Sequence, residues 1–176
     1  MNSQGWTLIE LLFVLSIITI LTALSLPQPD YSSRLSSGQQ LRQLAEGIAL
    51  AKAEAVLLGQ PVTVCGMKIA DNIECAPHWT AGFSIMTAEK LLDQHPWQLN
   101  GQLQWQGFSG RQDLRVDERG MLRYQNGSFT YCPFDQDMTK AQQLIVNAAG
   151  RTRLAKDHDQ DGIRETSHGT PITCHQ

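Results

Sequence analysis

The chain has 176 residues, of which 41% are hydrophobic, and a formal net charge of −3 at pH 7. This charge excludes a globally basic nucleic-acid binder, so any nucleic-acid site must be a local patch. Outside one apolar stretch near the N-terminus the composition is that of an ordinary globular protein, and about 145 residues are enough to bury a core without a metal.

The apolar stretch is the first element in chain order. Residues 6–26 carry a single charge, that of Glu10, close to the start of the stretch. About 21 residues that rise about 1.5 Å each form about 31 Å of helix, enough to cross the hydrocarbon core of a bilayer. We therefore predict a single membrane-spanning helix over residues 6–26. A carboxylate is costly in lipid, so Glu10 is expected to have a partner or a task; the alternative is that its side chain snorkels to the interface.

An ordinary secretory signal fits this N-terminus poorly. Such a signal has a basic leader and small residues after its apolar region, whereas here the small residue, Gly5, precedes the apolar region. The segment is therefore expected to remain in the mature protein.

Residues 5–10 read GWTLIE and are followed by an apolar run. This pattern resembles the class III signal of type IV prepilins and type II secretion pseudopilins, in which a prepilin peptidase cuts after the glycine and methylates the new terminus. The resemblance implies that residues 1–5 are a leader, that cleavage follows Gly5 and that Trp6 becomes the first mature residue. It also implies that Glu10 pairs with the N-terminal amine of a neighbouring subunit. Two features depart from the pattern: Trp6 stands where phenylalanine is usual, and the leader has no Lys or Arg.

A second helix is expected after the apolar stretch. Pro27, where such helices commonly kink, is followed by a polar linker over residues 28–38. Apolar residues then recur at the spacing of a helix, and Gly59 is well placed as its C-terminal stop. We predict that residues 27–59 form this linker and an amphipathic helix that lays its apolar face on a sheet. The apolar positions are Leu41, Leu44, Ala45, Ile48, Ala49, Ala51, Ala55 and Val56.

Residues 60–176 are predicted to form one β-rich globular region. Strand-like composition begins at Pro61, and short apolar runs then alternate with glycine-rich turn signals. Asn126-Gly127 is predicted as a hairpin turn between two of these runs, because both residues tolerate positive φ. The expected fold class is α+β, with the N-terminal helix packed on antiparallel β-sheet. Further strands are expected at residues 81–87, 102–108, 114–116, 121–124, 128–132, 142–147 and 152–155.

The four cysteines lie beyond the apolar stretch, and their even number suits two disulfides in an oxidising compartment. Four cysteines permit three connectivities, and the loop lengths favour Cys65–Cys75 with Cys132–Cys174. Zinc is the competing explanation. However, the sequence has no Cys-x-x-Cys pair, and Cys174 is followed directly by His175, which is a poor spacing for two ligands.

No catalytic motif is apparent in the sequence. The five histidines have no nucleophile arranged beside them, and there is no phosphate-binding loop or metal-hydrolase motif. We therefore predict that the chain is not an enzyme and needs no catalytic cofactor.

Three stretches, residues 44–61, 78–83 and 144–153, resemble the GspH/FimT group of minor pilins and pseudopilins. The resemblance implies a pilin-like fold and, as partners, other pilin or pseudopilin subunits and the prepilin peptidase. It also implies a single-pass protein of the inner membrane with its globular domain in the periplasm, which becomes extracellular when assembled into a fibre. A solitary membrane-anchored protein is the alternative that an uncleaved Gly5 would favour.

Residues 150–153 read GRTR, which is similar to the Gly-Arg-x-Arg motif associated with DNA binding by FimT-like minor pilins. On a strand, residues two apart share a face and are about 6.7 Å apart, so Arg151 and Arg153 can reach neighbouring phosphates. The planar donors of arginine suit phosphate, and Gly150 permits close backbone approach. These residues form the predicted DNA-binding site.

Two lysines, Lys156 and Lys140, would extend this site if the fold brings them near. The alternative is that the arginines are solvated or pair with the acidic residues that follow. The preferred role is a FimT-like minor pilin that binds DNA non-specifically for natural transformation. The runner-up is a GspH-like minor pseudopilin of a type II secretion system that makes protein contacts only.

The acidic loop at residues 157–162 resembles the start of a calcium loop. Asp157, Asp159 and Asp161 place oxygen ligands at alternate positions, and a glycine follows for the sharp turn. The twelfth position is His168 in place of the usual glutamate, although Glu165 stands at the ninth. A calcium-stabilised surface loop is therefore one expectation, and a solvated acidic turn is the other.

Overall fold

The computed structural model describes residues 8–24, 31–68 and 74–174. It divides the chain into two compact units, Met1–Ser32 and Ser33–Gln176, which are described separately.

The first unit contains α1 (Leu8–Leu24), a helix of 17 residues with Glu10 in its first turn. The other residues of the predicted span over 6–26, together with Gly5 and Pro27, lie outside the described residues. Among the helices that the structure describes, none combines the length and the apolar character needed to cross a membrane.

The helix α2 (Tyr31–Leu58) has 28 residues. It begins inside the stretch 28–38, so the prediction of a linker there is wrong from Tyr31 onward. The reason is that polar residues do not prevent a helix when its apolar face begins one turn later. The predicted C-terminal stop is confirmed, since Gly59 has a φ of +62°, the left-handed conformation that commonly ends helices.

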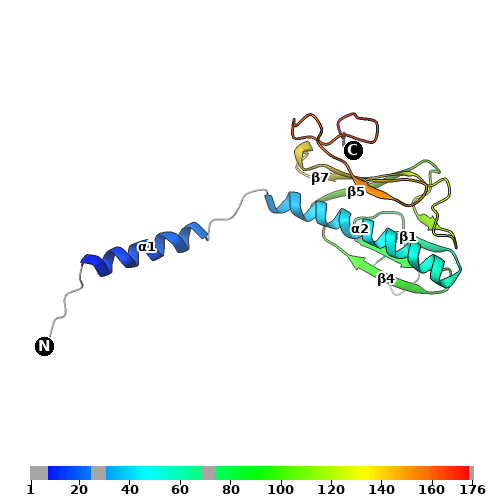
Figure 1. Cartoon of the computed structure of the whole chain (residues 1–176), viewed down its shortest axis with the longest axis horizontal. Helices are drawn as coiled ribbons and strands as arrows, with labels where there is room; N and C mark the ends of the chain where they lie inside the picture. The colour runs from blue at the N-terminus through cyan, green and yellow to red at the C-terminus, as the bar shows by residue number, and fades with distance from the viewer. Residues whose placement is uncertain (1–7, 25–30, 69–73, 175–176) are drawn as a thin grey trace. The chain divides into compact units, whose positions relative to one another are not determined.

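Two antiparallel sheets accompany α2, which confirms the predicted α+β class. Sheet 1 contains β1 (Val62–Met67), β2 (Cys75–Ala76), β3 (Gly82–Met86), β4 (Leu91–Pro96) and β6 (Leu114–Val116), in the order β2-β1-β3-β4 with β6 also paired to β1. Sheet 2 contains β5 (Gly101–Gly107), β7 (Gly127–Pro133), β8 (Gln142–Val146) and β9 (Thr152–Leu154), in the order β5-β7-β8-β9. Figure 1 shows strands of both sheets alongside α2.

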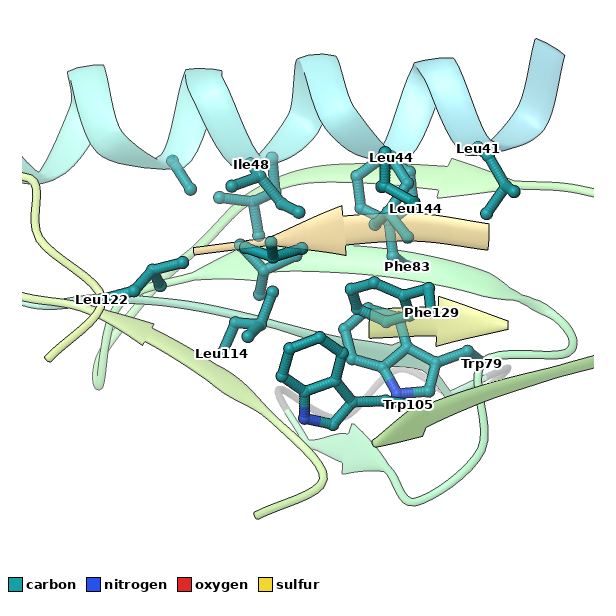
Figure 2. Close-up of a cluster of buried hydrophobic side chains, with 14 of the residues drawn as sticks. Leu41, Leu44, Ile48, Trp79, Phe83, Trp105, Leu114, Leu122, Phe129 and Leu144 are labelled. Carbon is teal, nitrogen blue, oxygen red and sulfur yellow. The ribbon is translucent and has the colours of Figure 1, made fainter. Parts of the chain in front are cut away.

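One hydrophobic core joins α2 to both sheets. Leu41, Leu44 and Ile48 of α2 are buried at helical spacing and point toward the strands (Figure 2). Below them the ring of Trp79 meets that of Phe129 edge-on, with the ring centroids 4.7 Å apart. Among the residues whose burial the structure describes, the buried core side chains all come from the unit Ser33–Gln176, so this unit contains what a domain needs to fold on its own.

Both disulfides have the preferred connectivity. Cys65–Cys75 joins β1 to β2, and Cys132–Cys174 joins β7 to the C-terminal segment, with Cα separations of 5.5 and 5.7 Å. Beside the second disulfide, Ile172 packs in a small cluster that partly buries Cys174. The C-terminal segment is thereby fastened to sheet 2.

Residues 121–124 do not form the predicted strand. Only Leu122 is fully buried there, and its N–H donates to the carbonyl of Ala148 at 3.0 Å rather than to a neighbouring strand. The hairpin predicted at Asn126-Gly127 is also wrong, because Gly127 is the first residue of β7 and pairs with residues of β5 and β8. The strand-like pattern at residues 121–124 arose from one buried side chain, Leu122, between two exposed ones.

Two strands of sheet 1, β2 and β4, were not predicted. The first has two residues, too few to leave a pattern. The second reads LLDQHP and lies at the edge of the sheet, where polar residues and a terminal proline are tolerated.

Candidate functional site

The predicted DNA-binding motif lies in the tight connection between β8 and β9. The N–H of Gly150 donates to the carbonyl of Asn147 at 2.8 Å, and Gly150 has a φ of +68°. The side-chain oxygen of Asn147 accepts the N–H groups of Ala149 and Arg151, at 3.0 and 2.9 Å. The N–H of Asn147 in turn donates to the carbonyl of Arg151 at 3.0 Å. The turn therefore fixes the backbone of the first arginine.

A lysine of α2 supports this turn from below. The Nζ of Lys52 donates to the carbonyl of Ala149 at 2.8 Å, and a Cβ placed on Gly150 would lie 2.7 Å from the Lys52 Cδ. Gly150 is buried, and its predicted close approach to DNA stays a prediction. The apolar stem of Lys52 occupies the space beside the Cα of Gly150. No local sequence pattern predicts this role of Lys52, because Lys52 and Ala149 are 97 residues apart in the chain.

Arg151 and Arg153 share the solvent face of sheet 2. Both are exposed, whereas Leu154 packs against the core, so the alternation of a strand directs the two arginines outward. Within the described part of the chain, neither guanidinium has an ion pair or a side-chain hydrogen bond. The pair is therefore available to an external anion.

The acidic residues that follow the arginines accept hydrogen bonds from the backbone of their own loop. Asp157 accepts the N–H groups of Gln160 and Gly162, at 2.7 and 2.9 Å, and Asp161 accepts that of Ile163 at 2.7 Å. None of these bonds involves an arginine. The alternative in which the acids neutralise the arginine pair therefore has no support in the described contacts.

The two lysines considered for the site differ in their surroundings. Lys156 is exposed just beyond β9. Lys140 is 9% exposed and pairs with Asp135 at 2.8 Å and Asp137 at 3.5 Å, so it does not extend the site. Its hydrogen bond holds the pKa of Asp135 below the usual range of a carboxyl group.

Three other arginines are committed to structural ion pairs. Arg111 and Arg115 both contact Asp113, at 2.9 and 3.0 Å, and Arg123 contacts Asp117 at 2.6 Å. Burial raises the pKa of Asp113, but the hydrogen bonds from its two arginines outweigh this effect and lower it overall. These side chains brace their loops and leave Arg151 and Arg153 as the exposed arginine pair on sheet 2.

The acidic loop gathers a different set of carboxylates from the predicted one. Asp157, Asp159 and Glu165 each offer an oxygen within 4.8 Å of the other two. Asp161 is not part of this group. The arrangement brings in Glu165 from the ninth position of the loop, and calcium binding at these residues stays a prediction.

The helix and two antiparallel sheets form a pilin-like fold. Two crystal structures of the type IV minor pilin FimU of Pseudomonas aeruginosa PAO1 match the fold with TM-scores of 0.52 and 0.54. Their identities to this chain are 18% and 19%, and the matches cover 68% and 72% of this chain and 92% and 93% of FimU. The minor pseudopilin EpsH of the Vibrio cholerae type 2 secretion system has 18% identity and a TM-score of 0.45, covering 68% of this chain and 95% of EpsH.

The family is shown by the sequence itself. The family model described as type II transport protein GspH matches residues 40–150, which is more than half of the chain. The chain therefore belongs to the GspH family, whose members are structural pilin-like subunits rather than enzymes. No curated protein matched the chain.

Proposed function

We propose that the chain is a minor pilin of a type IV pilus, which assembles through its N-terminal helix and binds DNA non-specifically during uptake. The observation that carries the DNA role is the exposed pair Arg151 and Arg153, held on one face by a hydrogen-bonded turn and free of ion pairs among the described residues. The family and the fold support the assembly role.

In this proposal, residues 6–26 anchor the subunit in the inner membrane after cleavage at Gly5. The supporting observation is that α1 is apolar on all sides apart from Glu10, and a helix of this kind needs lipid or other helices around it. The unit Ser33–Gln176 then lies in the periplasm, where its disulfides are stable. Prepilin peptidase and other pilin subunits are the expected partners.

DNA bound at this site would be contacted at its phosphates and not at its bases. Two arginines about 6.7 Å apart on a strand match neighbouring phosphate groups, and the guanidinium group can hold each phosphate with two donors. Contacts of this kind carry no base sequence information. Since the whole chain has a net charge of −3, the attraction is local and sensitive to salt.

The second candidate is a minor pseudopilin of a type II secretion system that contacts only proteins. The name of the matching family model, type II transport protein GspH, favours it. In that case the exposed arginines would contact acidic groups of a neighbouring subunit.

Binding of the fragment 31–176 to duplex DNA across a salt series tests the DNA role. Two phosphate contacts predict that a plot of the logarithm of the binding constant against the logarithm of the salt concentration has a slope of about −1.8. The double variant Arg151→Ala/Arg153→Ala should lose this binding. The matched control, Lys68→Ala/Lys90→Ala, removes the same charge from exposed positions beside sheet 1 and should leave most of the affinity. Absence of binding at low salt by the folded fragment would exclude the DNA role and favour the pseudopilin.

A further inference from the structure

The ends of all four strands of sheet 2 meet in one row beside the arginine pair. Gly107, Gly127, Val146 and Thr152 are successive partners across the sheet. The next position on each strand continues the row outward: Phe108 after β5, then residues 126, 147 and 151. The N–H of Phe108 donates to the carbonyl of residue 126 at 2.9 Å, which keeps this outer row in register. With strands about 4.8 Å apart, Phe108 lies about 14 Å from Arg151.

Two aromatic side chains stand exposed at this end of the sheet. Phe108 is 82% exposed and Tyr124 is 80% exposed, although large aromatic side chains usually bury most of their surface. Tyr124 also has a φ of +57°, which a bulky residue rarely adopts. Such a backbone conformation persists only where the surroundings enforce it.

Buried neighbours hold Tyr124 in this exposed position. On one side Leu122 is fully buried and donates its N–H to Ala148, next to the arginine turn. On the other side Gln125 is buried, and its side-chain oxygen accepts the N–H of Arg115 at 2.6 Å. The N–H of Gln125 closes the turn on the carbonyl of Leu122 at 2.8 Å. The ring is therefore presented by a fixed turn.

The solvent face of sheet 2 between the two edges has no carboxylate among its strand residues. Its outward positions are neutral or basic, and part of this face forms a groove of about 270 Å³ under the C-terminal segment. Gln143 lines the groove at 6% exposure, and its Oε1 has no hydrogen-bond partner in the described structure. The groove thus offers amide and hydroxyl groups, from Gln104, Gln106, Thr130, Gln143, Thr166 and Thr173.

The exposed rings and the neutral groove favour single-stranded over double-stranded nucleic acid. Exposed aromatic rings gain affinity by stacking on unpaired bases, whereas the bases of a duplex are already stacked on one another. Neutral amides beside a pair of arginines suit base edges next to phosphates. We infer that this face binds single-stranded nucleic acid, with phosphates on Arg151 and Arg153 and bases stacked on Phe108 and Tyr124. The inference rests on the proposed DNA role of the arginine pair.

The test compares a labelled oligothymidylate with a duplex of mixed sequence, both bound to the fragment 31–176. The variant Phe108→Ala/Tyr124→Asn removes both rings, and asparagine suits the left-handed conformation at the second position. We expect its affinity for oligothymidylate to fall by about tenfold for each ring lost, with little change for the duplex. The control, Leu57→Ala/Leu58→Ala, removes exposed apolar side chains from the end of α2 and should change neither affinity.

Two outcomes would overturn the inference while leaving the proposed function in place. One is equal binding of both nucleic acids that the ring substitutions do not affect but Arg151→Ala/Arg153→Ala abolishes. The other is intact DNA binding by the ring variant together with its loss from assembled fibres, which would make this face a subunit contact. If the wild-type fragment binds neither nucleic acid, the proposed DNA role and the inference both fail.

Discussion

Replacement of Glu10 by alanine is expected to remove the subunit from fibres while leaving the unit Ser33–Gln176 folded. Glu10 is the only charged residue of α1 and lies in its first turn. In a membrane or in a bundle of apolar helices, a lone carboxylate is tolerated when it meets a positive group, and the proposed partner is the N-terminal amine of a neighbouring subunit. Without the carboxylate, that amine would be left unpaired. The measurement is the amount of the variant in sheared fibres relative to the amount in membranes.

A matched control separates assembly from general charge effects. Glu46→Ala removes an exposed carboxylate from α2 and should leave incorporation unchanged. Circular dichroism and non-reducing gels would show whether each variant is folded and disulfide-bonded. If the Glu10→Ala variant entered fibres at the wild-type level, the assembly role of Glu10 would be wrong.

Removal of the disulfide Cys132–Cys174, by replacing both cysteines with serine, is expected to lower the free energy of unfolding by about 4 kcal/mol. The two residues are 42 positions apart, so the bond restricts a long loop of the unfolded chain. It also fastens the C-terminal segment, in which Ile172 packs in its own small cluster. Urea unfolding of the fragment 31–176 under non-reducing conditions measures the change.

The second disulfide provides the comparison. Cys65–Cys75 spans only 10 positions, for which the same loop-closure argument gives about 3 kcal/mol. Hydrogen exchange should in addition show lost protection near Ile172 only when Cys132–Cys174 is removed. A larger loss of stability from the short loop than from the long one would contradict the account of these bonds.

Much of the fold follows from local patterns. The end of α2 at Gly59 was predictable because only a residue at ease in the left-handed conformation ends a helix in this way. The strand Leu114–Val116 was predictable from its alternation of buried and exposed residues. In contrast, the edge strand β4 carries Asp93 and His95, whose side chains pair at 3.0 Å, and such a polar edge leaves no apolar alternation.

The candidate site was predictable only in part. The placement of Arg151 and Arg153 on one face was predictable, because alternate residues of a β-strand lie on the same face of the sheet. The order β5-β7-β8-β9 brings Phe108 to the same end of sheet 2 as this site, at the opposite edge of the sheet, and no local pattern determines that order. Lys52 is likewise positioned by the packing of α2, and the exposure of Tyr124 depends on buried residues on both sides of it.

The central claim is that the chain is a processed subunit of a pilus or pseudopilus, and the mass of its mature N-terminus tests this most directly. The full chain would be produced with a prepilin peptidase, purified from membranes and examined by intact-mass and peptide mass spectrometry, with a Gly5→Leu variant as the control. The account predicts loss of residues 1–5, a methyl group on the amine of Trp6, and an uncut variant. Recovery of the wild-type chain with its N-terminus at Met1 in the presence of an active peptidase would contradict it.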